Sequence, residues 1–202
     1  MSYPPTSAIL LAGGQSRRLG QDKALLDLGQ GPNIVRIAAL LKELCSEVIL
    51  VTDFPGRYSH LGMEVRWAHD RLPGQGPLVA LEAGLEAATH PFALAVACDL
   101  PFLNVQLLRY MLEKDRDYDA LVPRWRGKWH PLHAIYARRA LAQVRASIAR
   151  GERSLEALLP HLQVHPLRPQ EIRRIDPKGL SLFNLNTPQG LAWARRVAGL
   201  RS

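Results

Sequence analysis

The sequence has little of what marks a secreted or a membrane protein. Residues 1–7 contain no basic run followed by an apolar stretch, so we expect no signal peptide. The longest apolar stretches, such as residues 92–98, fall far short of the ~20 residues that a membrane-spanning helix needs. We therefore expect a cytoplasmic protein with no membrane partner.

Cysteine is also scarce, since Cys45 and Cys98 are the only two in 202 residues. Their number and spacing suit neither a disulfide scaffold nor a metal site, so we interpret both as buried thiols. Internal repeats, linkers and low-complexity tracts are absent, and a chain of this length favours a single domain over residues 1–202. A hydrophobic content of 47% excludes a disordered chain.

The formal net charge is strongly positive, at +8. Such a charge suits an anionic partner, but the basic residues are scattered along the whole chain. A phosphorylated small molecule therefore explains the charge as well as a nucleic acid does, and a merely basic surface remains an alternative. Because no aromatic-rich RNA-recognition signature accompanies the charge, we expect no nucleic-acid partner.

Apolar runs typical of strands alternate with amphipathic segments typical of helices, which predicts an α/β fold with a mostly parallel sheet and helices on both faces. Strands are expected at residues 8–12, 48–52, 65–68, 92–98, 120–123, 132–136 and 163–167. Helices are expected at residues 34–44, 77–88, 104–113, 138–149 and 154–160, and in a last segment capped by Thr187 and opened by Pro188.

The end of the first strand has the composition of an anion-binding loop. Gly13 and Gly14 follow that strand, and Arg17, Arg18 and Lys23 come shortly after. Glycines let backbone N–H groups approach an anion, and the basic side chains add positive charge. The order of these residues matches neither a P-loop nor a dinucleotide-binding fingerprint, and a plain strand-to-loop turn would also explain the two glycines.

A second candidate residue, Asp99, follows the apolar strand at residues 92–98. Open α/β sheets bind their ligands at the carboxyl ends of their strands, so Asp99 is expected at a ligand-binding edge. A lone carboxylate suits Mg²⁺, which binds one or two carboxylates together with substrate phosphates and water. The alternative is that Asp99 only caps the turn before Leu100 and Pro101.

The segment LAGGQSRRLGQDK, residues 11–23, resembles the signature LAGGxSxRMGxDK of the molybdenum cofactor guanylyltransferase (MobA) family of nucleotidyltransferases. The resemblance continues, in the family's order, almost to the end of the chain. The matching segments are DRLPGQGPLVALEAGL (residues 70–85), CDLPFL (98–103), HPLHAIY (130–136), GERSL (151–155) and FNLNTP (183–188).

This resemblance implies a three-layer, Rossmann-like nucleotidyltransferase fold and a magnesium-dependent reaction. The terminal phosphate of molybdopterin, with or without molybdenum, would attack the α-phosphorus of GTP and release pyrophosphate. GTP and molybdopterin are thus the implied substrates, with molybdoenzymes or other cofactor-biosynthesis proteins as further partners. No enzyme nucleophile is needed, because the attacking phosphate is already anionic.

The resemblance also implies roles for individual residues. Asp99 corresponds to the family's magnesium ligand, and Thr52 stands where some members have a nucleotide-binding asparagine. The implied catalytic residues are Arg17, Lys23 and Asp99, and the implied GTP-binding residues are Leu11, Ala12, Gly13, Gly14, Lys23, Thr52, Asp70 and Asp99.

Three further residues, His130, Asn184 and Asn186, are expected on the pterin side of the site. Asn186 is also expected to approach the metal and the phosphates. The alternatives are that His130 only orders the adjacent strand, and that the two asparagines only form the turn that caps the last helix. A separate alternative for Asp70 is that it pairs at the surface with Arg71 or Arg66 rather than contacting the nucleotide.

Other functions remain as alternatives. Similar enzymes that use CTP, with molybdopterin or a sugar or alditol phosphate as acceptor, tend to read LAAG where this chain reads LAGG, so Gly13 favours guanine. A non-catalytic carrier of the nucleotide or cofactor belongs to another class of protein. The presence of both Lys23 and Asp99 argues against such a carrier.

Overall fold

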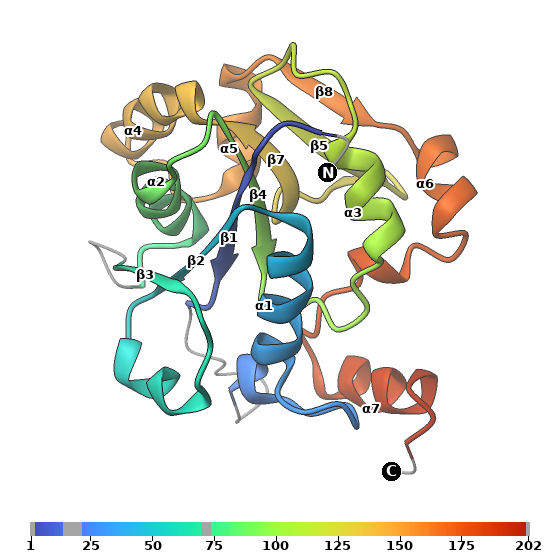
Figure 1. Cartoon of the computed structure of the whole chain (residues 1–202). Helices are drawn as coiled ribbons and strands as arrows, with labels where there is room; N and C mark the ends of the chain where they lie inside the picture. The colour runs from blue at the N-terminus through green and yellow to red at the C-terminus, as the bar shows by residue number, and fades with distance from the viewer. Residues whose placement is uncertain (1–2, 14–21, 70–73, 201–202) are drawn as a thin grey trace.

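The computed structural model describes residues 3–13, 22–69 and 74–200, and the strands of these residues form one central sheet (Figure 1). The strands are β1 (Ser7–Leu11), β2 (Glu47–Thr52), β3 (Arg66–His69), β4 (Phe92–Ala97), β5 (Ala120–Trp125), β6 (Lys128–Trp129), β7 (His133–Ala137) and β8 (Val164–Leu167). Their order across the sheet is β3-β2-β1-β4-β7-β5-β6, and β8 pairs with β5.

Strands β1 to β4 are parallel, so their carboxyl ends lie at the same edge of the sheet. Leu11, at the end of β1, is in register with Val51 of β2 and with Ala97 of β4. Strand β7 is antiparallel to β4, and its first residue, His133, pairs with Val96. The start of β7 therefore lies beside the ends of β1, β2 and β4, at what we term the carboxyl edge.

Helices cover both faces of the sheet, as Figure 1 shows, and this is the three-layer arrangement that the sequence predicts. Because side chains alternate along a strand, Leu10 of β1 packs in the cluster of one face and Ile9 in the cluster of the other. One face carries α1 (Asn33–Leu44), α3 (Val105–Leu112) and α6 (Pro169–Ile175), and the other carries α2 (Pro77–Ala87), α4 (Leu141–Ala149) and α5 (Leu155–Leu158). Helix α7 (Pro188–Val197) packs in a smaller cluster of its own.

The strands at the centre of the sheet are buried along almost their whole length. All five residues of β1 are buried, and so are residues 93–97 of β4. Burial on both faces explains why these strands appear in the sequence as continuous apolar runs rather than alternating patterns. Cys45 and Cys98 are both free and buried, which confirms their interpretation as buried thiols.

The helices and strands expected from the sequence are present, with ends that differ by a few residues. Thr187 caps α7 as expected, since its Oγ1 accepts a hydrogen bond from the N–H of Gly190 at 3.0 Å. Helix α6 and the β5–β6 hairpin are not expected from the sequence, and the turn of this hairpin places Arg126 and Gly127 at φ of 50° and 79°. Both elements are short, so neither has a clear hydrophobic period. No helix of the described chain combines the length and the hydropathy that crossing a membrane requires.

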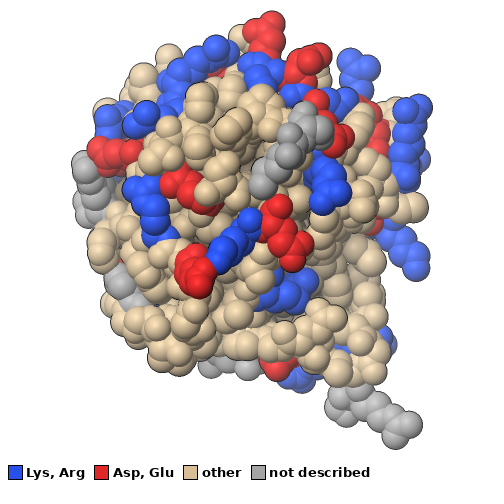
Figure 2. All heavy atoms as spheres, in the orientation of Figure 1, with Lys and Arg blue, Asp and Glu red and all other residues tan. Residues whose placement is uncertain are grey.

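Acidic and basic side chains are interspersed on the viewed face of the molecule (Figure 2). Several form ion pairs between helices, such as Arg145 of α4 with Glu82 and Glu86 of α2. On this face the excess positive charge does not gather into a single patch, in agreement with its scatter along the sequence.

Helix α2 packs very closely on β1 at Gly84. A Cβ atom on Gly84 would lie 2.4 Å from Cγ2 of Ile9, well inside van der Waals contact. We predict that Gly84→Ala lowers the free energy of unfolding by about 1–3 kcal/mol, because the overpacked core must shift to accept the methyl group. Chemical denaturation of the purified variant measures this loss.

Gly56→Ala is the matched control, since a Cβ there meets nothing within 4 Å. It should change the stability by less than about 0.5 kcal/mol. The double variant Gly84→Ala with Ile9→Ala should lose less stability than the sum of the losses of the two single variants, because Ile9→Ala removes the clash. Full additivity would show that contact with Ile9 is not the cause.

Candidate active site

Lys23 and Asp99 meet at the carboxyl edge of the sheet. Lys23 opens a short 3-10 helix, η1 (Lys23–Leu25), and Asp99 lies in the turn that follows β4. The Lys23 Nζ is 3.6 Å from Oδ2 of Asp99, and the two side chains are only 19% and 17% exposed. The structure thus joins the two charges that the sequence analysis assigned to one centre.

Two asparagines from the segment before α7 complete this group, which we term the central cluster: Lys23, Asp99, Asn184 and Asn186. Asn184 Nδ2 donates a hydrogen bond to Oδ1 of Asp99 at 3.0 Å, and Lys23 Nζ donates to Oδ1 of Asn186 at 2.6 Å. Since the side chain of Thr187 caps α7, the two asparagines do more than form the helix cap.

Burial dominates the electrostatics of Asp99. Desolvation raises the pKa of its carboxyl group above the ordinary value, while the charge of Lys23 and the hydrogen bond from Asn184 act in the opposite direction. The net rise means that the two neighbours only partly compensate the buried negative charge. A cation beside Asp99 would therefore be stabilised, and the carboxylate and amide oxygens of the cluster are donors that suit a hard cation.

The turn that presents Lys23 is fixed by Asp22. Its Oδ1 accepts a hydrogen bond from the N–H of Ala24 at 3.0 Å, which caps η1. Its Oδ2 accepts from the hydroxyl of Tyr58 at 2.8 Å and from Nη1 of Arg57 at 3.2 Å. The segment after β2 thereby holds Asp22 and η1 in place, and Lys23 projects from a fixed backbone.

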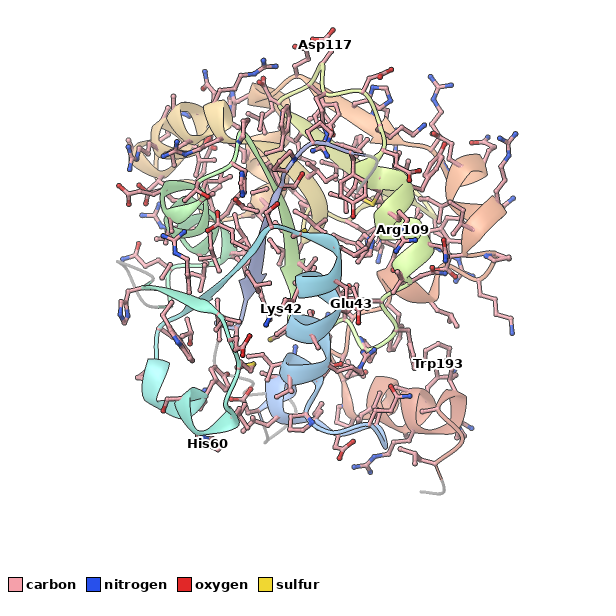
Figure 3. The ribbon with its side chains drawn as sticks, viewed as in Figure 1. Lys42, Glu43, His60, Arg109, Asp117 and Trp193 are labelled. Carbon is pink, nitrogen blue, oxygen red and sulfur yellow. The ribbon has the colours of Figure 1, made fainter. Side chains whose placement is uncertain are left out.

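Helix α7 holds the C-terminal part of the cluster against the Asp99 turn. Trp193 rises from α7 toward the body of the protein (Figure 3). Its ring centroid lies 4.5 Å from that of Phe183 and 6.0 Å from that of Phe102. Because Phe102 follows Asp99 and Phe183 precedes Asn184, these aromatic contacts join the two segments.

The expected nucleotide-binding strand end is only partly exposed. Leu11 and Ala12 are buried, whereas Gly13 is exposed and a Cβ on it would meet no atom of the described residues within 4 Å. Thr52 is 1% exposed, and its Oγ1 accepts a hydrogen bond from the N–H of Phe54 at 3.2 Å. Gly14, Arg17 and Asp70 lie outside the described residues, so their expected roles stay predictions.

A cavity of about 240 Å³ opens beside the central cluster. Asn184 belongs to both, so the cavity adjoins the carboxylate of Asp99. Its aromatic lining comes from the end of β6 through the start of β7, and other lining residues come from Pro77 and the start of α5. Its lining includes Trp129, His130, His133, Ser154 and Glu156.

Two histidines of this cavity are held neutral. Burial lowers the pKa of His133 to about 3, with a smaller contribution from His130. Burial also lowers the pKa of His130, and the charge of Lys128 acts in the same direction. His130 was expected at the site from the sequence, whereas His133 was not, although both belong to the HPLHAIY segment. Trp129, which directly precedes that segment, was not expected at the site either.

Comparison with known proteins places these residues in a family. Residues 8–166 match the profile of the MobA-like NTP transferase domain. A probable molybdenum cofactor guanylyltransferase of Chloroflexus aggregans is 38% identical over 199 residues, which cover 96% of this chain and 95% of that protein. One from Pelotomaculum thermopropionicum is 35% identical over 192 residues, or 95% and 93% of the two chains.

Solved structures have the same fold. A crystal structure of molybdopterin-guanine dinucleotide biosynthesis protein A from Archaeoglobus fulgidus superimposes with a TM-score of 0.82 at 25% identity, covering 96% of this chain and 99% of that one. The 2-C-methyl-D-erythritol 4-phosphate cytidylyltransferase of Thermus thermophilus gives 0.72 at 18% identity, covering 98% and 100%. At that identity the second likeness shows the fold alone.

The raised pKa of Asp99 gives a pH-dependent prediction. Because the folded protein holds the proton of Asp99 to a higher pH than the unfolded chain does, ionisation of Asp99 lowers stability as the pH rises. Asp99→Asn should therefore melt at a higher temperature than the parent protein at pH 7, and the difference should shrink as the pH falls. Calorimetry across the pH range in which both proteins are folded tests this.

Asp117→Asn, at an exposed position far from the central cluster, is the control and should show no such pH-dependent gap (Figure 3). If Asp99→Asn instead melted at a lower temperature at pH 7, attraction by Lys23 would outweigh desolvation at Asp99.

Proposed function

The chain belongs to the MobA-like NTP transferase family, and we propose that it transfers GMP from GTP to the terminal phosphate of molybdopterin, with release of pyrophosphate. One observation carries the proposal: Lys23 and Asp99, from distant parts of the chain, meet at 3.6 Å on the carboxyl edge of the sheet. That edge is where open α/β folds bind nucleotides.

In this reaction an oxygen of the molybdopterin phosphate attacks the α-phosphorus of GTP, and the bond from that phosphorus to the β-phosphate bridging oxygen breaks. Negative charge builds up on the phosphate oxygens and on the departing pyrophosphate. Lys23, as a compact positive charge fixed at the end of its turn, is suited to hold these oxygens. Arg17, which the resemblance assigns to the same task, stays a prediction.

The residues around Asp99 fit Mg²⁺, which we propose as the cofactor. The Asp99 carboxylate is incompletely compensated, and Asn186 adds an amide oxygen 2.6 Å from the Lys23 nitrogen. Within the described chain no three His, Cys, Asp or Glu residues gather into a metal site. A donor set of this size suits Mg²⁺, which shares its ligands with substrate phosphates and water and would neutralise charge on them when bound.

The cavity beside the cluster is the proposed site of the pterin. Asn184 lies between the cavity and Asp99, so a ring in the cavity would place an attached phosphate toward the central cluster. Trp129 offers an apolar aromatic surface, and the neutral His130 and His133 offer hydrogen-bonding groups without charge. These features suit a flat, polar heterocycle, and they extend the predicted pterin side beyond His130 and the two asparagines.

Guanine is the proposed base because of Gly13. Its missing side chain leaves open space among the described residues at the end of β1, in line with the LAGG motif of the signature that residues 11–23 resemble. A CTP-dependent enzyme with molybdopterin or a sugar phosphate as acceptor is the nearest alternative, since the cytidylyltransferase fold is the same. A non-catalytic carrier would not require Lys23 and Asp99 to converge. We further propose that residues 1–202 act as one catalytic domain in the cytoplasm.

The proposal predicts the nucleotide and metal dependence of turnover. With molybdopterin and Mg²⁺, pyrophosphate release should be faster with GTP than with CTP, ATP or UTP, and should stop when EDTA removes the metal. Pyrophosphate release measured with all four nucleotides in parallel tests this. Faster use of CTP would replace the guanylyl assignment, and binding of GTP without release would support the carrier.

Lys23→Ala and Asp99→Asn should each lower kcat by about 10²-fold or more, because each removes charge stabilisation at the reacting phosphates. The control variants are Lys42→Ala and Asp117→Asn, at two exposed residues that Figure 3 labels. They remove the same charges from exposed sites and should leave kcat unchanged. Equal losses in the target and control variants would show a general charge effect.

Trp129→Ala should raise the KM for molybdopterin by about 10-fold and leave the KM for GTP unchanged, because it removes a stacking surface worth roughly 1–3 kcal/mol from the acceptor cavity alone. Trp67→Ala, at a tryptophan that is 36% exposed on β3, is the matched control. A rise in the KM of GTP instead would place the nucleotide, rather than the pterin, in this cavity.

A further inference from the structure

The turn that carries Asp99 is held by α1 as well as by the sheet. Asn33, the first residue of α1, is 3% exposed, and its Nδ2 donates a hydrogen bond to the carbonyl oxygen of Cys98 at 2.7 Å. A buried backbone carbonyl needs a donor, and here the donor comes from a side chain on another layer of the fold. Asn33 therefore fixes the residue immediately before Asp99.

Arg36 continues this connection on the other side of Asp99. It lies one turn further along α1, donates to Oδ1 of Asn33 at 2.8 Å, and also donates to the carbonyl oxygen of Pro101. Burial lowers the pKa of Arg36, which indicates that its guanidinium group is withdrawn from water to make these contacts. The carbonyls before and after Asp99 are thus both bound by α1.

The remaining backbone of the turn is bound from other directions. The N–H of Cys98 donates to the carbonyl oxygen of Leu11 at 3.0 Å, and the carbonyl oxygen of Asp99 accepts from the N–H of Leu185 at 2.9 Å. These bonds fix the turn against β1 and against the segment before α7. The contacts of Asn33 and Arg36 add bonds from α1, so the backbone that carries Asp99 is held by three separate parts of the fold.

We propose that Asn33 and Arg36 are positioning residues that orient Asp99 for the transfer reaction through its backbone, without contacting the substrates. The catalytic part of this inference rests on the proposed function, whereas the immobilisation of the turn does not. A displacement of a catalytic group by about 1 Å can cost on the order of 10²-fold in rate, so the contacts of α1 affect turnover even though they touch no reacting atom.

The two buried cysteines provide a test that needs no enzyme activity. Cys98 is 9% exposed and lies in the turn, whereas Cys45 is 4% exposed and ends α1. In Asn33→Leu, which removes the donor to the Cys98 carbonyl, Cys98 should react with N-ethylmaleimide about 10-fold faster or more, and the rate for Cys45 should not change. Mass spectrometry of the labelled peptides separates the two rates.

Comparing the labelling rates of Cys98 and Cys45 distinguishes a role of Asn33 in positioning the Asp99 turn from a role in docking α1. If Asn33 merely anchored α1, both cysteines would become reactive together and the melting temperature would fall, and the proposal would be overturned. An unchanged rate for Cys98 would overturn it as well. Arg36→Met, which removes the donor to the Pro101 carbonyl, should also make Cys98 alone more reactive. Arg109→Met, at an exposed arginine on α3, is its control and should alter neither cysteine (Figure 3).

Kinetics test the catalytic part. Asn33→Leu and Arg36→Met should lower kcat by about 10-fold to 10²-fold and raise the Mg²⁺ concentration for half-maximal rate, while the KM for GTP stays within about 2-fold. Arg36→Lys, which keeps the charge and one donor, should recover part of kcat. Normal kcat in a variant with a reactive Cys98 would overturn the catalytic role.

The two proposals fail separately. If the parent protein shows no GMP transfer but Cys98 alone becomes reactive in Asn33→Leu, the proposed function is wrong and the immobilisation of the turn by α1 stands. If the parent protein transfers GMP and Cys98 stays protected in both variants, the proposed function stands and the positioning role is wrong.

Discussion

The contact between Lys23 and Asp99 is the interaction on which the site depends. It brings together two largely buried charges at 3.6 Å. The raised pKa of Asp99 shows that Lys23 and Asn184 only partly offset the free-energy cost of burying its carboxylate. Such an arrangement contributes little to stability for its own sake. It is useful where the two charges can instead face the phosphates and the cation of a nucleotide substrate, as the proposed reaction requires.

The rest of the fold serves to make that contact possible. The parallel strands β1 and β4 are neighbours, so their carboxyl ends lie side by side, and the turns that carry Lys23 and Asp99 meet at this edge. Asp22 and Tyr58 fix the first turn, and Asn33 with Arg36 fix the second. The aromatic contacts of α7 bring the third segment, with its two asparagines, against the Asp99 turn, and the hydrogen bond from Lys23 to Asn186 joins that segment to the first turn. Apart from Asp22, each of these supports comes from a segment distant in sequence.

Fold and chemistry separate clearly in this protein. The 2-C-methyl-D-erythritol 4-phosphate cytidylyltransferase of Thermus thermophilus has the same fold at 18% identity, so the sheet and its helices do not decide the substrates. The chemistry resides in the loops at one edge of the sheet. Because β7 is antiparallel, its start joins that edge, and its neighbouring residues Trp129 and His130 form a cavity beside Asp99. The proposed nucleotide half of the site therefore comes from parallel strands, and the proposed acceptor half from the antiparallel strand β7 and the segment before it.

The sequence by itself determined the layered α/β fold, the family and the candidates Lys23 and Asp99, because hydrophobic period, glycine turns and short motifs are properties of local sequence. Only the tertiary structure decided that Asn184 and Asn186 bind Asp99 and Lys23, that His133 and Trp129 line a cavity, and that Asn33 and Arg36 hold the Asp99 turn. These contacts join segments far apart in the chain. Their formation depends on strand order and packing between layers, which no local pattern encodes.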